Sequence, residues 1–224
     1  MTANADYRTA RRFFTSKTAT SYDFVVKCAT LNQDIKWKKQ VSVLSRTSSA
    51  VLDLACGTGI LSQHLRDENI SVLAGLDLTR EFLFAFERKI GVPAAQGTAE
   101  SLPFREDLFD AVVSSYLAKY IDPEKVVNES YRVLKPGGLL VFHDFSMPSV
   151  AAIRLLWKMH FGILRLAGLF AHSWQIVFNE LRQVIEQSTW EEVTVQALKS
   201  NGFEKISVLP LTFGTSCIIS GRKP

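Results

Sequence analysis

The stretch at residues 51–61, VLDLACGTGIL, limits the fold of this chain more than any other part of the sequence. An apolar run carrying one acid, Asp53, ends at Cys56-Gly57-Thr58-Gly59 and is followed by a second apolar segment. Glycine allows positive φ and removes Cβ atoms, so a strand can turn sharply and a ligand can approach the main chain. The stretch therefore predicts a strand, a glycine-rich loop and a helix, as in nucleotide-binding α/β folds.

Apolar runs alternate with helix-like segments over the first 148 residues, which predicts βαβ units and a mostly parallel sheet. The predicted strands are Ala50–Ala55, Ser71–Asp77, Val92–Gln96, Asp110–Ser114 and Leu139–Phe145. The predicted helices are Ile60–Asp67, Arg80–Ile90 and Glu124–Leu134. The glycines of Lys135-Pro136-Gly137-Gly138 are expected to end the last helix and lead into the next strand.

The pattern changes after Pro148, where residues 149–190 predict a long helical insertion. A helix at Glu191–Asn201 follows, and two strands, Glu204–Pro210 and Ser216–Ser220, are expected to form an antiparallel hairpin. We therefore expect one three-layer α/β domain with a Rossmann-like, mostly parallel, seven-stranded sheet and an antiparallel last strand. Its parts are an N-terminal helical arm (1–48), a ligand-binding core (49–148), the insertion (149–190) and a C-terminal helix and hairpin (191–224).

Cysteine usage and hydropathy exclude several classes of protein. Cys28, Cys56 and Cys217 show neither the spacing of a zinc site nor a disulfide framework, so we expect no metal and a reducing compartment. No run of 18 uncharged apolar residues exists, and the N-terminus lacks the apolar region of a signal peptide. These features predict a cytoplasmic protein.

The charge of the chain is uneven. Residues 1–48 hold nine Lys and Arg against three Asp, a net charge of +6, whereas the whole chain carries +4. A basic arm is typical of contact with an anionic surface or substrate, and equally of a solvated helix face. The arm has no nucleic-acid recognition motif, so we expect no nucleic-acid partner.

Two kinds of ligand compete for the glycine-rich loop. A dinucleotide requires G-x-G-x-x-G, but Ser62 stands where the third glycine would be. Tyr116 and Lys119 are also one residue too close for a Tyr-x-x-x-Lys dehydrogenase. The other ligand is S-adenosylmethionine, whose ribose hydroxyls need an acid at the end of the next strand. Asp77 stands there, although an acid at that position also suits a helix N-cap.

At this point the sequence resembles a known family. The segments DLACGTG, GLDL, GTAESLPF, FDAVVSS and YRVLKPGGLLV, taken in order, are similar to class I S-adenosylmethionine-dependent methyltransferases. More narrowly they resemble the C-methyltransferases of ubiquinone and menaquinone biosynthesis (UbiE-like). The resemblance covers nearly the whole chain, including FFTSKTATSYD, IKWKKQ and LKSNGFEKISVLPLTFGTSCIISGRK.

The resemblance implies a role for each matching position. The methionine end of the cofactor would lie against Asp53, Ala55, Cys56, Gly57, Thr58 and Gly59. Asp77 would hold the ribose, and the adenine would lie against Leu78, Thr98 and Ala99. Ser114 would lie beneath the cofactor, and Tyr22 of the arm would close over it. The family often has Gly at position 55 and Asp or Asn at position 98, so Ala55 and Thr98 are departures.

Carbon methylation of a quinol ring requires a phenolate-like acceptor, so a base or water chain is useful. The candidates are Tyr22, Lys119 and His143, with Tyr116 and Asp144 beside them. The quinone subgroup has an Arg-Asn pair after the fourth strand, and here Lys119 takes the place of the Arg without its forked geometry. His143 is equally compatible with a histidine packed at a strand end.

The insertion is the clue to the acceptor. Arg154, Lys158 and Arg165 fall within about 40° of each other on a helical wheel whose remainder is apolar. This pattern is typical of an interfacial helix or an apolar lid, and also of a core helix with one solvated edge. We expect a lipophilic acceptor, with a membrane contact at the inner face and a homodimer as open alternatives. The alternative functions are methylation of another small molecule on O, N or C, and cofactor binding without turnover.

Overall fold

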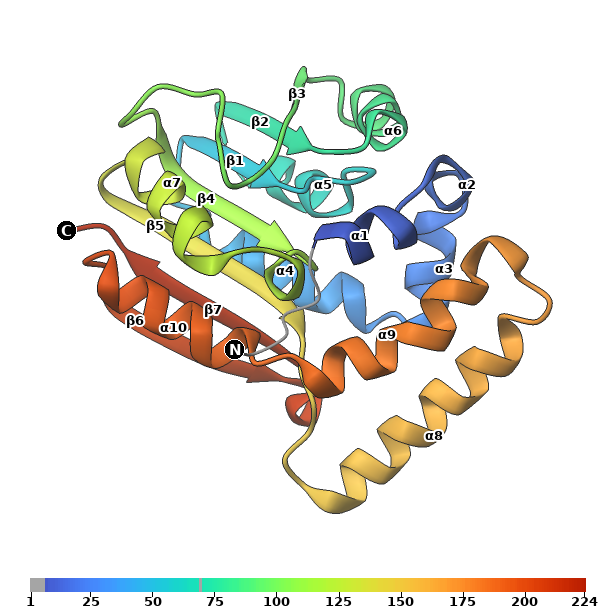
Figure 1. Ribbon diagram of the computed structural model, residues 1–224. Coiled ribbons are helices and arrows are strands. Elements are labelled where there is room, and N and C mark those ends of the chain that lie inside the picture. Colours follow the sequence, from blue (N-terminus) through green and yellow to red (C-terminus); the bar gives the residue numbers. More distant parts are fainter. Residues whose placement is uncertain (1–6, 69) are drawn as a thin grey trace.

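The computed structural model describes residues 7–68 and 70–224, and these form a seven-stranded sheet between two layers of helices (Figure 1). The strands are β1 (Ala50–Leu54), β2 (Val72–Asp77), β3 (Ala94–Gln96), β4 (Phe109–Ser115), β5 (Leu134–Phe145), β6 (Glu204–Leu211) and β7 (Ser216–Arg222). Their order across the sheet is β3-β2-β1-β4-β5-β7-β6, and only β7 runs antiparallel to its neighbours. The predicted fold class is confirmed.

The helices have the following bounds. They are α1 (Tyr7–Phe13), α2 (Ser16–Ala19), α3 (Tyr22–Ala29), α4 (Gln33–Leu44), α5 (Ile60–Arg66), α6 (Arg80–Ile90), α7 (Pro123–Val133), α8 (Ala151–Ala167), α9 (Gln175–Gln187) and α10 (Trp190–Ser200). Three short 3-10 turns are η1 (Ala118–Tyr120), η2 (His172–Trp174) and η3 (Thr212–Gly214). Within the described ranges no helix is long and apolar enough to cross a membrane.

The apolar runs form strands because both faces of the central sheet are covered. All five residues of β1 are buried. One core, which includes Val126 of α7 and Trp190 of α10, fills one face, and another, which includes Val41 of α4 and Leu61 of α5, fills the other. Strands buried on both faces are expected to be nearly continuous in apolar residues, as β1 and β4 are.

One predicted link differs from the structure. The glycines of residues 135–138 do not link helix and strand, because β5 already begins at Leu134, which pairs with Phe109 of β4. Gly137 takes a φ of +78°, and the register shifts between Phe109 and Ala111, so the strand absorbs an irregularity there. The predicted helical insertion is helical and consists of α8 and α9, which Figure 1 shows as a hairpin extending away from the sheet.

The first three helices, α1 to α3, lie beyond the carboxyl ends of the parallel strands, whereas α4 packs on a face of the sheet (Figure 1). A separate apolar cluster joins them to the insertion, with Phe13 of α1, Trp174 of η2 and Phe178 of α9 packed around Tyr120. Residues 1–6, which belong to the predicted arm, lie outside the described residues. The first three helices and the insertion, which are far apart in sequence, are therefore packed together over the carboxyl ends of the parallel strands.

Candidate functional site

The loop between β1 and α5 is shaped by three residues with positive φ. Ala55, Gly57 and Gly59 have φ values of +54°, +54° and +85°. A Cβ on Gly59 would come within 2.6 Å of Ile90 Cγ1, so this position requires glycine for packing as well as for backbone conformation. Ala55 adopts the left-handed region at a cost of about 1–2 kcal/mol, which explains why glycine suits this position.

Asp77 ties the ends of β1 and β2 together. Its carboxylate accepts the Gly57 N–H at 2.9 Å through Oδ2 and the Thr79 N–H at 2.8 Å through Oδ1. Burial raises the pKa of Asp77, and the N–H groups of Thr79 and Gly57 oppose that rise. Each carboxylate oxygen has a further lone pair, so Asp77 retains capacity to accept hydroxyl donors from a ligand.

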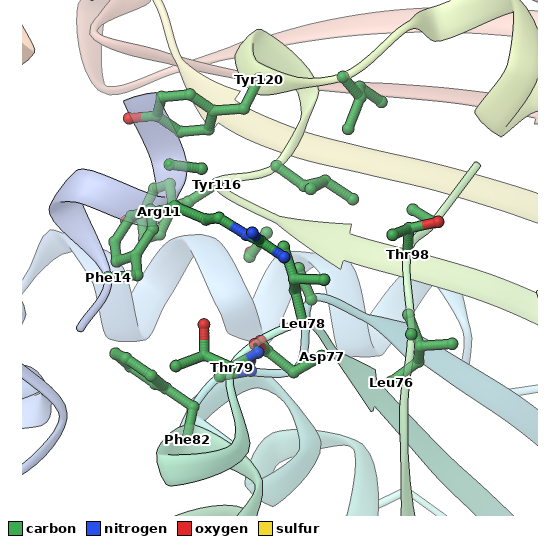
Figure 2. A pocket seen from close by; sticks show the side chains of 18 of the residues that line it. Arg11, Phe14, Leu76, Asp77, Leu78, Thr79, Phe82, Thr98, Tyr116 and Tyr120 are labelled. Carbon is green, nitrogen blue, oxygen red and sulfur yellow. Dashed lines mark hydrogen bonds between the residues drawn. The ribbon is translucent and has the colours of Figure 1, made fainter. Parts of the chain in front are cut away.

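A cavity of about 830 Å³, its mouth included, opens beside Asp77, and we call it the strand-end cavity. It lies where β1 and β4 are neighbours but their following segments diverge, which is where open α/β sheets bind ligands. Figure 2 shows Asp77 and Thr79 on one wall of the cavity and Thr98 on a second wall. Phe14 and Tyr120 lie on the side opposite Thr98. The predicted residues that line it are Tyr22, Ala55, Gly57, Asp77, Leu78, Thr98 and Ala99.

Other residues of the loop support the cavity from behind and do not line it. Cys56 is buried against Phe86 and Leu83, and burial raises the pKa of its thiol well above normal. Thr58 donates a hydrogen bond from its hydroxyl to Asp23 Oδ1. Gly59 faces Ile90. These positions determine the course of the main chain, and the expectation that they line the ligand cavity is not met.

Asp53 also lies outside the strand-end cavity. It is fully buried in β1, and its Oδ2 accepts a 2.7 Å hydrogen bond from Ser62 Oγ. Ser62 is thus the partner of this buried acid. Burial raises the pKa of Asp53 to about 7, against the opposing effects of the Ser62 hydrogen bond and of Lys38.

This shift gives a pH-dependent prediction. A carboxyl whose pKa rises on folding, here from 3.8 to about 7, contributes stability that is complete below 3.8 and is lost as the pH rises through 7. The Asp53→Asn variant cannot ionise, so we expect its stability relative to the native chain to rise by roughly 2–3 kcal/mol between pH 5 and pH 8. Urea unfolding at both pH values measures this. If the stability difference between the variant and the native chain were the same at both pH values, the raised pKa of Asp53 would be contradicted.

Ser114 does not lie beneath the cavity, contrary to the prediction. It is inside β4, and its hydroxyl donates to the Leu54 carbonyl of β1 at 2.8 Å. Successive side chains of a strand point to opposite sides, so the next residue, Ser115, lines the strand-end cavity instead. The strand ends at Ser115, one residue later than predicted, and the lining side chain is that of the last strand residue.

His143 is fully buried in β5 and is not among the described residues that line the strand-end cavity. Its Nε2 lies 2.8 Å from Ser216 Oγ, which itself donates to the Asp144 carbonyl. Nε2 is therefore the donor, and Nδ1 accepts from Ser115 Oγ at 2.7 Å. Burial, with Lys38 and Lys119 nearby, lowers the pKa of His143 well below normal. The ring is a neutral acceptor behind Ser115 and does not face a ligand itself.

Lys119 lies in η1 and forms an ion pair with Asp144, and both side chains are fully buried. Its ammonium lies 4.8 Å from the centroid of the Tyr120 ring and 5.4 Å from that of Phe145. Burial lowers the pKa of Lys119, and the Asp144 carboxylate opposes the shift. Lys119 lines a second cavity of about 490 Å³, the middle cavity, in which it is the cation among the described lining residues.

Tyr22 of α3 lines both the strand-end and the middle cavity, as do Phe14, Tyr116 and Tyr120. These four aromatic side chains therefore face both spaces. Burial raises the pKa of Tyr22, and carboxylates, first among them Asp34 and Asp23, raise it further. The Tyr22 phenol therefore stays protonated and can act as a donor, but not as a base.

Sequence reasoning missed a polar cluster beneath Tyr116. The Tyr116 hydroxyl donates to Asp34 Oδ1 at 2.6 Å, and Asp34 also forms a buried ion pair with Lys38. The spacing of Asp34 and Lys38, four residues apart on α4, was the signal that could have revealed the pair. Arg11, from the arm, was missed as a lining residue, and Figure 2 shows it reaching into the strand-end cavity.

Comparison with known proteins agrees with this geometry. A model of the ubiE/COQ5 methyltransferase family matches residues 1–223. The demethylmenaquinone methyltransferase of Chlorobaculum tepidum is 27% identical over 96% of this chain and 93% of its own. The demethylmenaquinone methyltransferase of Thermus thermophilus is 29% identical over 93% of this chain and 99% of its own.

A solved structure matches the fold. A protein of Methanococcus maripaludis, assigned as an S-adenosyl-L-methionine-dependent methyltransferase, superposes with a TM-score of 0.67. The match covers 94% of each chain at 17% identity. At that identity the likeness shows the shared sheet and helix arrangement.

Proposed function

The chain belongs to the ubiE/COQ5 methyltransferase family, and we propose that this S-adenosyl-L-methionine-dependent methyltransferase methylates a ring carbon of a prenylated quinol precursor. Two relatives matched over more than 90% of both chains are demethylmenaquinone methyltransferases, which supports an acceptor of that class. The observation that carries the proposal is the pair of adjoining cavities, one with a carboxylate and the other apolar with a single buried ammonium.

The residues of the strand-end cavity fit the cofactor. Asp77 has free lone pairs for the two ribose hydroxyls, and such charge-assisted bonds are strong. Leu78 and Phe82 offer apolar surface to the adenine, and the Thr98 hydroxyl can accept from its amine. Ala55 and Gly57 allow the methionine part to approach the main chain. When bound, the cofactor supplies an electrophilic methyl group on a cationic sulfur.

The acceptor ring belongs in the middle cavity. Tyr22, Tyr116 and Tyr120 surround the ring and exclude water. The same side chains orient the ring so that its reacting carbon faces the strand-end cavity. The Lys119 ammonium stabilises the phenolate that forms as the ring hydroxyl loses its proton, and the low dielectric of the buried site strengthens this effect. Ser115 lines the strand-end cavity and donates its hydroxyl proton to His143 Nδ1, so its oxygen can accept a hydrogen bond from a ligand hydroxyl there.

The arm and the insertion together form the cover of this site. Residues 7–48 supply Phe14 and Tyr22, and residues 149–190 supply Trp174 and Phe178, to the walls of the middle cavity. A lipophilic acceptor is embedded in a bilayer, so the enzyme would act as a peripheral protein at an anionic membrane surface. The cations Arg154, Lys158 and Arg165 on α8 support that contact.

The proposal is tested by incubating the protein with methyl-labelled cofactor and a panel of acceptors. The panel contains demethylmenaquinol, a prenylated benzoquinol, the same rings without prenyl chains, and a catechol as an oxygen acceptor. We expect label on a ring carbon of a prenylated quinol, identified by NMR of the product. Label only on oxygen, or label on none of the quinols, would refute the assignment of the acceptor.

A further inference from the structure

A third cavity lies outside the middle one, between α3, α4, η3 and the inner face of α8, and we call it the outer cavity. It measures about 1090 Å³ with its mouth included. Its floor is made of buried aromatic side chains, Trp37, Trp157, Phe161 and Phe178. The walls are therefore apolar enough to hold a hydrocarbon.

Most of the polar side chains in its wall, Gln33 excepted, are paired with protein atoms. Trp37 Nε1 donates to Thr212 Oγ1 at 2.7 Å, and the Thr215 hydroxyl donates to the Thr212 carbonyl. The Thr30 hydroxyl donates to Val26, and His160 Nε2 bonds the Ala29 carbonyl at 2.7 Å. Such a wall gains nothing from a polar ligand, whereas an aliphatic chain can fill it without leaving buried groups unpaired.

The outer cavity borders the middle cavity directly. Five residues line both spaces, which are Ala29, Thr30, Phe145, Phe178 and Leu181. The middle cavity in turn borders the strand-end cavity through Phe14, Tyr22, Tyr116 and Tyr120. The three cavities therefore form a series. An acceptor ring bound in the middle cavity would extend its side chain into the outer cavity.

The rim of the outer cavity is apolar and exposed. Leu31, Leu156 and Phe213 line the cavity, yet are 69%, 62% and 79% exposed. Leu31 and Phe213 are at the tips of two separate turns and have positive φ values of 51° and 58°, which non-glycine residues adopt at a cost. The two turns thus hold large apolar side chains outward at the entrance.

The rim continues along α8 as an exposed apolar stripe. Leu155, Leu156, Met159, Ile163 and Leu166 lie within about 100° of one another on the helix, and each is more than half exposed. Arg154, Lys158 and Arg165 border the stripe on its other side. Lys158 lies 3.5 Å from Glu186, and Arg154 bonds the Pro148 and Ser149 carbonyls. An apolar stripe with cations along one edge complements an acyl layer with anionic headgroups above it.

We propose that the outer cavity binds the isoprenoid chain of the acceptor, and that its rim docks on an anionic bilayer so that the chain enters directly from the lipid. This rests on the proposed function, because it assumes that the acceptor carries such a chain. The occupant of the exposed α8 stripe is the lipid bilayer. If a second copy of this chain covered the α8 stripe instead, the proposed docking on a bilayer would be contradicted.

Chain binding is tested without cofactor or turnover. Dibromostearate, whose bromines quench nearby tryptophans, should quench the native chain saturably and be displaced by farnesol. Trp37→Phe/Trp157→Phe should lose most of the quenching, whereas Trp190→Phe, in α10 outside the cavity, should retain it. Absence of saturable quenching, or quenching unchanged in the double variant, would overturn the chain site.

Docking is tested by co-sedimentation with vesicles of phosphatidylglycerol and phosphatidylcholine. Phe213→Asp should lower the partition coefficient about tenfold or more, since burial of a Phe side chain is lost. The control is Phe84→Asp, at a phenylalanine on α6 that is 56% exposed and lies outside the outer cavity, and this variant should bind as the native chain does. No binding by the native chain, or a dimer that Phe213→Asp converts to monomer, would overturn the docking.

The two proposals fail separately. Neither binding assay requires methyl transfer, so chain and vesicle binding without methylation of any quinol would refute only the assigned acceptor. Methylation of a prenylated quinol by a protein that binds neither dibromostearate nor vesicles would refute only the outer-cavity inference.

Discussion

Replacing Asp77 with alanine should weaken cofactor binding at least about fiftyfold, which corresponds to roughly 2–3 kcal/mol. The variant loses the carboxylate that would bind the ribose, and it also loses the two main-chain contacts that hold Gly57 and Thr79 in place. Isothermal titration calorimetry with S-adenosylhomocysteine measures the change. An affinity within about threefold of the native value would contradict the ribose assignment.

Asp110 provides a matched control for this experiment. It lies in β4 at the opposite end of the sheet, and its Oδ2 also accepts two main-chain N–H groups, from Ser49 and Ala50. Asp110→Ala therefore removes a comparable set of hydrogen bonds without touching the strand-end cavity. We expect it to lower the stability of the protein and to leave cofactor affinity unchanged.

Lys119→Met should lower the free energy of unfolding by about 3–5 kcal/mol, because it leaves the buried Asp144 carboxylate without its partner. Urea unfolding at pH 7 measures the change. The double variant Lys119→Met/Asp144→Leu removes both charges and should recover most of the lost stability. We expect that it does not recover methyl transfer, since the ammonium that faces the acceptor is absent.

The control for this prediction is an ion pair of the same residue types on the surface. Lys125 and Asp122 lie 3.3 Å apart and both are exposed to solvent. Lys125→Met should cost less than about 1 kcal/mol, because water screens the charges that remain. If Lys119→Met were no more damaging than Lys125→Met, the buried pair would not be a structural unit.

The sequence alone was sufficient to derive the layout of the core. The alternation of strands and helices, the hairpin at the end and the position of Asp77 were all predicted, because each depends on local periodicity and on glycine placement. Asp77 is the last residue of β2, and its side chain reaches the loop after β1 because the two strands are parallel neighbours. The helix at Arg80–Ile90 was predicted with the bounds that the structure has.

Side-chain direction was less accessible to sequence reasoning. Ser114 and Ser115 differ by one position, yet one donates to the Leu54 carbonyl and the other lines the cavity. His143 was a candidate base, but its neighbours Ser115 and Ser216 enclose it. A strand alternates its side chains with a period of two, so an error of one residue in its end reverses the assignment.

What the sequence determined by itself is therefore the order of elements, the ligand loop and the acid beside it. Only the tertiary structure decided that the N-terminal arm packs against η1, β5 and the insertion, which follow it at least 70 residues later in the chain, and that together they enclose a series of three cavities. Local periodicity depends on neighbours three or four residues away, whereas a cavity depends on which distant side chains fail to fill the space between packed elements.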